Sequence, residues 1–271
     1  MDQRPSPFTA VADHVFRCTA EFAGPQGTES VNVGLVVGAE GAALVDCGAT
    51  VEQGRLLRAA VAGVTDRPLA AVVLTHWHHD HTVGLAGLGA GLSVAHESVR
   101  ERLAGIGTPN AGLPTRGLAV AWALDLGGGV RLEAAHLGRG HTDGDLVVVV
   151  PGTDVVFGGD LIESAAPPSY GPDSFPHEWA ATLDGLIGLM TETTQAVPGH
   201  GDPVDRAFVF EQRGRVAAVS GEMTRLAGLG VNPEDAETRG DWALPYAYLR
   251  PGLEAGWAQA RSAGPRRLPL A

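Results

Sequence analysis

The segment Leu74 to Gly84, LTHWHHDHTVG, constrains this chain more than any other. It holds four histidines and one aspartate within six residues, directly after an apolar run, 69–74, that is typical of a buried strand. Each buried imidazole needs hydrogen-bond partners for its ring nitrogens, so several adjacent ones are costly to bury without a shared partner. A metal ion is such a partner, because neutral imidazole nitrogen and carboxylate oxygen both suit zinc and similar ions. The sequence therefore predicts a metal site at the C-terminal end of this strand.

Three later segments offer further ligands of the same kind. Each segment follows a strand-like run and contains turn formers. The segments are LGRGHTDGD, which carries His141, VVFGGDLI, which carries Asp160, and VPGHGD, which carries His200. Neighbouring side chains at positions 76 and 78 would diverge on a helix, so convergence requires an irregular loop at the strand end. One ion cannot easily take all these groups, whereas two adjacent ions can. The candidates from the first segment are His76, His78, Asp80 and His81.

The charge balance narrows the class of partner. The chain has 271 residues with 44% hydrophobic composition, enough for one large core, and a formal net charge of −12. All 19 basic residues are arginine, which argues against nucleic acid and anionic membrane as partners and excludes catalytic lysine. No apolar run approaches the roughly 20 residues of a membrane span, and the N-terminus lacks signal-peptide features, so we expect a cytoplasmic protein. Cys18 and Cys47 are predicted to be small buried hydrophobic residues.

Apolar periodicity predicts a strand-rich chain with a few helices. Most strand candidates lie in two groups separated by helical and loop segments, and the longest helical pattern is near the C-terminus. The predicted strands are 14–20, 31–38, 42–48, 69–74, 92–95, 120–124, 130–137, 146–150 and 155–157, and the predicted helices are 52–63, 96–103, 177–190 and 208–229.

The combination of motifs resembles the metallo-β-lactamase superfamily of metal-dependent hydrolases. The resemblance covers residues from about 10 to 205, and it rests on THWHHDH at 75–81, GHTDGD at 140–145, FGGD at 157–160 and PGHG at 198–201. It implies an α/β (α+β) fold, a four-layer αββα sandwich with two mixed sheets face to face, helices outside, and metals at one edge. We expect a catalytic domain, 1–205, and a C-terminal helical extension, 206–271, packed on the same domain.

Carried over residue by residue, the resemblance implies two ions bridged by Asp160. The first ion would be held by His76, His78 and His141, and the second by Asp80, His81 and His200. Asp46, in LVDCG, is a candidate for a residue that holds one of these ligands in place without binding the ions itself. Two Zn²⁺ per chain are expected, with iron or manganese left open because all the ligands are nitrogen or oxygen.

Two ions about 3.5–4 Å apart lower the pKa of a shared water to around 7 and polarise a substrate carbonyl. Asp80 is the candidate catalytic residue, because its carboxylate can orient the attacking water and return its proton. We therefore expect a hydrolase that acts on a small-molecule acyl substrate. The oligomeric state stays open, a homodimer included.

The branch of the superfamily depends on two acidic positions. Lactamases with the FGG motif typically follow it with a cysteine ligand and, slightly later, a lysine that grips the drug's carboxylate. Here Asp160 and Glu163 stand at those positions, and His81 is a ligand that this lactamase branch lacks. The pattern is similar to glyoxalase II, lactonases and esterase-like hydrolases, so an ester, thioester or lactone is the expected substrate. The alternatives are hydrolysis of a β-lactam amide, a mononuclear iron dioxygenase using part of the ligand set, and a non-catalytic metal-binding scaffold.

The remaining aromatic and histidine residues have less specific assignments. Two loops, 105–117 and 163–179, are expected to set specificity, and Tyr170, Phe175 and His177 in the second are candidates for the substrate pocket. Trp77 and His79 lie between the predicted ligands and are expected to point outward or line the pocket. Ordinary packing or surface roles are expected for His14, His96 and His136.

Overall fold

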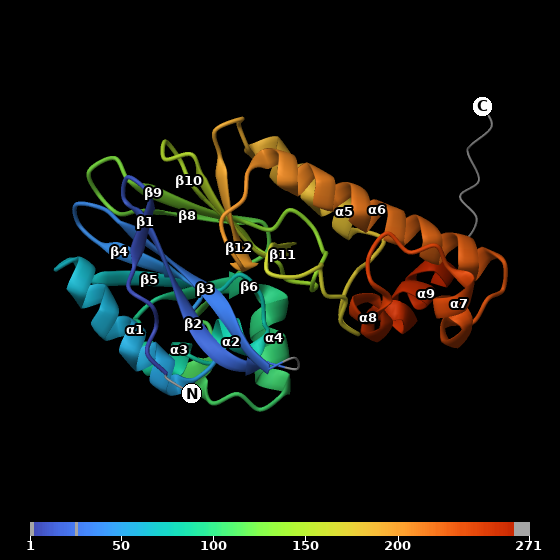
Figure 1. The fold of residues 1–271 in the computed structure, drawn as a ribbon. Coiled ribbons are helices and arrows are strands. Elements are labelled where there is room, and N and C mark those ends of the chain that lie inside the picture. The colour runs from blue at the N-terminus through green and yellow to red at the C-terminus, as the bar shows by residue number, and fades with distance from the viewer. Residues whose placement is uncertain (1–2, 25–26, 263–271) are drawn as a thin grey trace.

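The computed structural model describes residues 3–24 and 27–262 and folds them into two facing sheets with helices outside (Figure 1). Within those residues, no helix is long and apolar enough to cross a membrane. Cys18 and Cys47 are buried free thiols, as the sequence predicted, and burial raises the pKa of Cys18 to about 12. The predicted αββα sandwich of two mixed sheets is confirmed.

The first sheet has seven strands in the order β1-β2-β3-β4-β5-β6-β7. Its first four strands pair antiparallel, and β4 to β7 then pair parallel, with connections that include helices. The strands are β1 Thr9–Ala12, β2 Val15–Gly24, β3 Gly27–Val37, β4 Ala42–Val45, β5 Leu69–Val73, β6 Ser93–His96 and β7 Arg116–Leu118. Since parallel strands need their helical connections on the faces of the sheet, this half carries its helices on its outer side.

The second sheet has five strands in the order β12-β11-β10-β9-β8. The pairs from β8 to β11 are antiparallel, and β12 joins β11 in parallel. The strands are β8 Ala121–Asp125, β9 Arg131–Ala135, β10 Val147–Val150, β11 Val155–Glu163 and β12 Gln195–His200. Every residue of β11 is buried, which places the polar end of this strand inside the molecule.

Helices cover the outer faces of both sheets (Figure 1). Those of the first half are α1 Val51–Val64, α2 His79–Thr82, α3 Leu85–Leu88 and α4 Glu97–Gly105. Those of the second half are α5 Trp179–Leu189, α6 Arg206–Gly228, α7 Ala236–Arg239, α8 Tyr246–Leu249 and α9 Leu253–Ser262. The start of α1 is fixed by Thr50, whose hydroxyl accepts a hydrogen bond from the Gln53 amide.

Three of the apolar clusters among the described residues hold these layers together. The cluster between the sheets joins Val45 and Val73 of the first sheet to Leu132, Val148 and Phe157 of the second. A second cluster packs α1 and α4 on the first sheet, and a third packs α5, α6 and α9 against the second sheet. The C-terminal helices therefore share a core with the second sheet, while the proposed division at residue 206 stays a prediction.

The main departure from the predicted elements concerns β11. The sequence predicted a strand over 155–157, but the strand continues to Glu163 through Gly158 and Gly159. Gly159 has a φ of +52°, and the pairing with β12 shifts register at this point. A side chain on Gly159 would lie 2.8 Å from the Thr75 side chain, so glycine permits the close approach of β11 to the histidine motif. Short edge strands β1 and β7 were not predicted because each is only a few residues long.

Candidate metal centre

The histidine motif leaves the first sheet as a bend and then forms a short helix. β5 ends at Val73, and α2 begins at His79 with His78 as its N-terminal flanking residue. The bend orients His76 and His78, and the helix orients Asp80 and His81. This is the irregular geometry that the spacing predicted, since neither a strand nor a helix alone would bring these side chains together.

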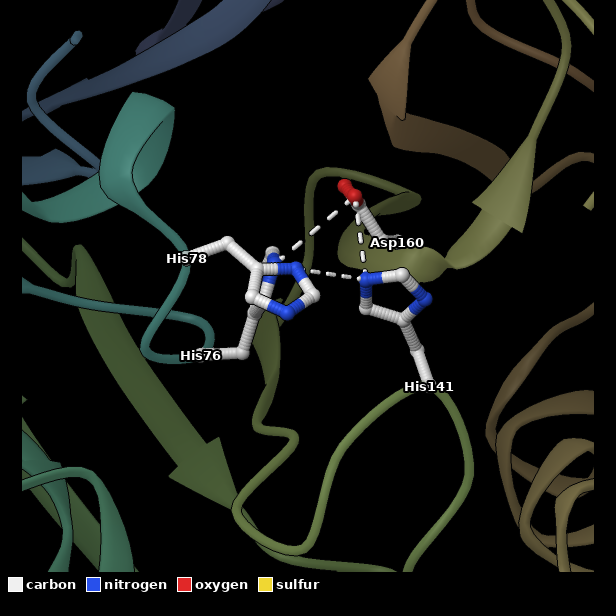
Figure 2. A group of neighbouring side chains, drawn as sticks. All are labelled: His76, His78, His141 and Asp160. Atoms are coloured by element: carbon white, nitrogen blue, oxygen red, sulfur yellow. Dashed lines mark hydrogen bonds and ion pairs between the residues drawn. The ribbon is translucent and has the colours of Figure 1, made fainter. Parts of the chain in front are cut away.

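One group of ligand atoms joins the motif to the second half of the chain (Figure 2). His76, His78, His141 and Asp160 each have a ligand atom within 4.8 Å of the others. His141 Nε2 lies 2.9 Å from His78 Nδ1 and 3.4 Å from Asp160 Oδ2. His76 Nε2 lies 3.7 Å from the same carboxylate oxygen.

A second group lies directly beside the first and is formed by Asp80, His81 and His200. Asp80 Oδ2 lies 3.4 Å from His81 Nε2 and 3.3 Å from His200 Nε2. Asp160 reaches this group as well, because its Oδ1 is 3.1 Å from His81 Nε2 and its Oδ2 is 3.4 Å from His200 Nε2. Asp160 thus faces both groups, which is the position of a bridging ligand.

The outward ring nitrogens are held by hydrogen bonds that fix each imidazole. His141 Nδ1 is 3.2 Å from the Ser169 carbonyl oxygen, and His200 Nδ1 is 2.8 Å from that of Ser30. A carbonyl can only accept, so these Nδ1 atoms carry a proton, and Nε2 is the ring nitrogen that faces the centre. Hydrogen-bonding partners of this kind are typical of histidines that bind a metal.

The other three rings are held by side chains. His81 Nδ1 lies 2.8 Å from Asp46 Oδ2, and His76 Nδ1 lies 3.1 Å from the Thr75 hydroxyl. His78 is turned the other way, with Nε2 3.1 Å from a carboxylate oxygen of Asp173 and Nδ1 toward the centre. Asp46 also accepts hydrogen bonds from the Thr75 amide and hydroxyl.

Several inward atoms are buried without a hydrogen bond. Among the residues that the structure describes, these include His76 Nε2, His81 Nε2 and Asp160 Oδ1. Buried polar atoms in native proteins nearly always have a hydrogen-bond partner. Several buried atoms without one that face the same point therefore indicate a missing partner that accepts lone pairs. A metal ion fits this requirement, and the nitrogen and oxygen donors suit zinc.

The electrostatics of the two groups differ. Burial lowers the pKa of His141 to about 4 and that of His76 well below its usual range, with nearby histidines adding to the effect for His76. Burial acts in the same direction on His200, but the Asp160 and Asp80 carboxylates outweigh it and raise its pKa to about 11. The carboxylates therefore concentrate their negative potential where cations would bind.

Two further acidic residues lie at the site: Glu163, which was expected where lactamases carry a lysine, and Asp173, which was not predicted. Asp173 accepts hydrogen bonds from His78 and from the Trp77 indole, which lower its pKa to about 2 against the opposing effect of burial. Glu163 is buried within reach of Asp160 and His200, and burial together with Asp160 raises its pKa. The proline-rich composition of 165–176 marked a loop at the site, but nothing in it distinguished Asp173.

The structure defines the contacts of the three candidates for the substrate pocket. Tyr170 has no exposed surface and packs against Trp179, so its predicted place in a pocket wall is wrong. The proline-rich loop turns this ring into the core. His177 is hydrogen-bonded through both ring nitrogens, to Ser220 Oγ and the Gly256 carbonyl oxygen. Phe175 is half-buried and lies under the Arg139 guanidinium, 4.2 Å from the ring centre.

The remaining histidines also have definite places. His79 is the exposed member of the motif, and its ring contacts Phe22 edge to face. His96 and His136 stack on each other with ring centres 4.3 Å apart, away from the ligand groups. His14 is exposed and bonds to the Val37 carbonyl.

Comparisons with known proteins find a matching family model and related sequences. The model of the metallo-beta-lactamase superfamily matches residues 27–200. The chain is 30% identical over 175 residues to the metallo-beta-lactamase type 2 of Bacteroides fragilis. This match covers 62% of this chain and 68% of that protein. It is 29% identical over 85 residues to the type 2 enzyme of Bacillus cereus, where the match spans 31% of this chain and only 33% of the relative.

The fold has solved counterparts. The metallo-beta-lactamase from Pontibacter korlensis superposes with a TM-score of 0.70 at 24% identity, covering 79% of this chain and 99% of that one. The superfamily model spans more than half of the chain and ends at the candidate ligand His200. On these grounds the chain belongs to the metallo-β-lactamase superfamily.

Proposed function

We propose that the protein is a binuclear metal-dependent hydrolase of small esters, thioesters or lactones. The observation that carries the proposal is the position of Asp160, whose two oxygens face both groups of nitrogen donors. A carboxylate between two such groups is suited to hold a pair of cations close together.

The proposed ions are two Zn²⁺. His76, His78 and His141 would hold one, Asp80, His81 and His200 the other, and Asp160 both. When bound, such a pair supplies Lewis acidity that polarises an acyl carbonyl and makes a water molecule nucleophilic near neutral pH.

The chain's own residues position the reactants. Asp80 is buried, and His81 and His200 hold its pKa well below the usual range although burial opposes this. It is therefore available as a carboxylate, which accepts a hydrogen bond from a water molecule, orients it and takes up its proton. The fixed rings of His141 and His200 keep their geometry because backbone carbonyls hold them.

The charge around the centre favours an uncharged acyl group over an anionic lactam. Glu163 is buried next to Asp160 and His200, and the chain contains no lysine to bind a substrate carboxylate. The site therefore offers no lysine at this position to hold the carboxylate of an anionic lactam, whereas an ester, thioester or lactone needs no such partner.

Hydrolysis of a β-lactam amide is the second candidate, and the names of the relatives support it. The substrates of the two candidate functions differ in the leaving group. They also differ in charge, because the lactam carries a carboxylate that the enzyme must bind. A scaffold that binds metal without catalysis is the third outcome to be tested.

The test combines metal content with substrate turnover. We expect about two equivalents of zinc per chain, and cleavage of thioesters and lactones at rates well above that of nitrocefin. Replacing an outer partner of a metal ligand typically costs 10–100-fold in metal affinity or activity, so Asp160→Asn, which changes a direct ligand, should cost more than about 100-fold in kcat/KM. Asp202→Asn is the control, because Asp202 is exposed and paired with Arg17.

Two results would contradict the proposal. Faster turnover of nitrocefin than of any ester, thioester or lactone would favour the lactamase. Full zinc loading without turnover of any acyl substrate would favour the scaffold.

A further inference from the structure

An apolar cavity of about 240 Å³ opens beside the metal-binding motif, outside the ligand groups. It lies between the start of α1, the α2–α3 segment and the loop that follows α4. Its walls include Trp77, His79, Val83, Ala86, Leu103 and Ile106.

The cavity shares a wall with the metal centre. Trp77 and His79 are the sequence neighbours of the ligand His78, and the indole lies against the His78 ring with centres 4.8 Å apart. On the other side, His79 Nδ1 is 3.5 Å from Asp80 Oδ1. A group bound in this cavity therefore lies one side chain away from both ligand groups.

The chemistry of the walls selects an uncharged group. Ile106 is 65% exposed and Val83 is 38% exposed, so large aliphatic side chains stand at the surface beside the cavity without being covered. Grouped exposed apolar side chains on a folded protein commonly mark a binding site. The nearby Arg102 guanidinium stacks on Trp77 at 4.8 Å and pairs with Asp143, so this cation is already engaged.

The size of the cavity limits what it can hold. An apolar cavity of about 150 Å³ is large enough to bind benzene. A volume of about 240 Å³ therefore accommodates one aromatic ring with a short linker, or a short alkyl chain.

We propose that this cavity binds the apolar part of the acyl group, an aromatic ring or a short alkyl chain, while the acyl carbonyl lies at the metal centre. The proposal rests on the proposed hydrolase function and specifies its substrate class. It assigns substrate selection to the end of α4 with the segment that follows it, 103–112, and to the residues between the candidate metal ligands.

The kinetic test uses a series of thioesters of N-acetylcysteamine from acetyl to octanoyl. Each methylene that leaves water contributes about fourfold to binding, so kcat/KM should rise at least tenfold between acetyl and hexanoyl and then level off when the cavity is full. Two variants alter the cavity: Ala86→Phe fills it and Ile106→Ser makes its rim polar. Both should flatten the dependence of kcat/KM on acyl chain length.

Leu229→Ser is the matched control, because Leu229 is 66% exposed like Ile106 but lies at the end of α6. This variant should keep the full dependence on chain length. Circular dichroism and unfolding midpoints of all three variants identify any loss of fold.

A binding measurement separates the cavity from the reaction. The probe is 4-phenyl-2-butanone, a ketone with no leaving group, and acetone is its counterpart without the ring. Calorimetry should show the aromatic ketone binding at least tenfold more tightly than acetone, with the difference lost in Ala86→Phe. If thioesters are cleaved at rates that do not depend on chain length and the two ketones bind alike, the cavity proposal is overturned and the hydrolase stands. If the aromatic ketone binds as expected but no acyl substrate is cleaved, the cavity is supported and the proposed hydrolase is overturned.

Discussion

Asp46 accepts three hydrogen bonds, two from Thr75 and one from the ring of His81. It follows β4 with a φ of +64°, in the left-handed region that asparagine and aspartate tolerate better than other side chains. The residue thus joins the end of β4 to the histidine motif and holds the Nδ1 proton of His81, which leaves Nε2 free to face the centre.

Asp46→Asn should therefore weaken metal binding without disturbing the backbone. If the amide oxygen of asparagine keeps the bond from the Thr75 amide, its NH₂ group faces His81 Nδ1. A donor at that place favours the His81 tautomer with the proton on Nε2, which cannot bind an ion. We expect a loss of about 10–100-fold in zinc affinity by competition with a chelating dye, and a similar loss in kcat/KM at limiting zinc. Unchanged affinity would show that Asp46 serves only the backbone of the motif.

The candidate metal ligands and the loop 163–179 show what single residues reveal in a sequence. His76, His141 and His200 could be predicted as candidate ligands because each follows a strand-like run. The sequence also repeats imidazole and carboxylate donors after these runs, and burial alone does not explain that repetition. Asp173 could not, since an aspartate in a proline-rich loop is usually a solvated turn residue. Tyr170 was misplaced for the same reason, because the path of an irregular loop depends on packing that no periodicity encodes.

At the scale of elements, α4 begins at a histidine that acts as an acceptor. His96 Nδ1 accepts hydrogen bonds from the Ser98 amide and hydroxyl, and its ring stacks on His136. Burial lowers the pKa of His96, and the nearby His136 adds to the effect. A histidine whose pKa is lowered by folding stabilises the fold above its unfolded pKa of about 6.5, and this contribution is lost as the pH falls below that value.

His96→Asn should reduce this sensitivity to acid, because asparagine is a good N-terminal cap and does not titrate. Between pH 7.5 and 5.5 the wild type should lose more of its free energy of unfolding than the variant, by less than the roughly 1 kcal/mol of a full cap because His96 is only partly buried. Urea unfolding at each pH gives the comparison. His14→Asn, at an exposed position, should leave the wild-type slope unchanged. Parallel slopes for wild type and His96→Asn would mean that the cap survives protonation.

His177 links three helical elements, since it lies just before α5 and bonds to Ser220 on α6 and Gly256 on α9. His177→Ala removes both bonds and leaves partly buried partners unsatisfied, so we expect a loss of about 1–3 kcal/mol in the free energy of unfolding. Ser220→Ala removes one bond and should cost less. KM for the acyl substrate should not change in either variant. A raised KM in His177→Ala at unchanged stability would instead place His177 in contact with substrate.

The whole molecule is two strand-rich halves whose ligand groups meet at one edge. The first half supplies the four donors of the histidine motif, and the second supplies His141, Asp160 and His200. The pairing of two halves could be predicted from strand-like runs that each end in a donor. The order of strands within each sheet could not, because it depends on long-range pairing that the local pattern does not contain.

Metal binding should therefore stabilise the molecule as a cross-link between its halves. An ion at 100 times its dissociation constant adds about 2.7 kcal/mol, so two ions add about 5 kcal/mol, or roughly 10–20 °C in Tm for a chain of this size. Calorimetry of the zinc-loaded protein with and without a chelator measures the shift. Hydrogen exchange should speed up on chelation in 75–82, 140–145 and 158–163, and much less in β10, which is central in its sheet. In Asp160→Asn the shift in Tm should shrink to half or less, because the bridging carboxylate is gone. A chelator that leaves Tm and exchange unchanged would show that the two halves are held by their apolar cores alone.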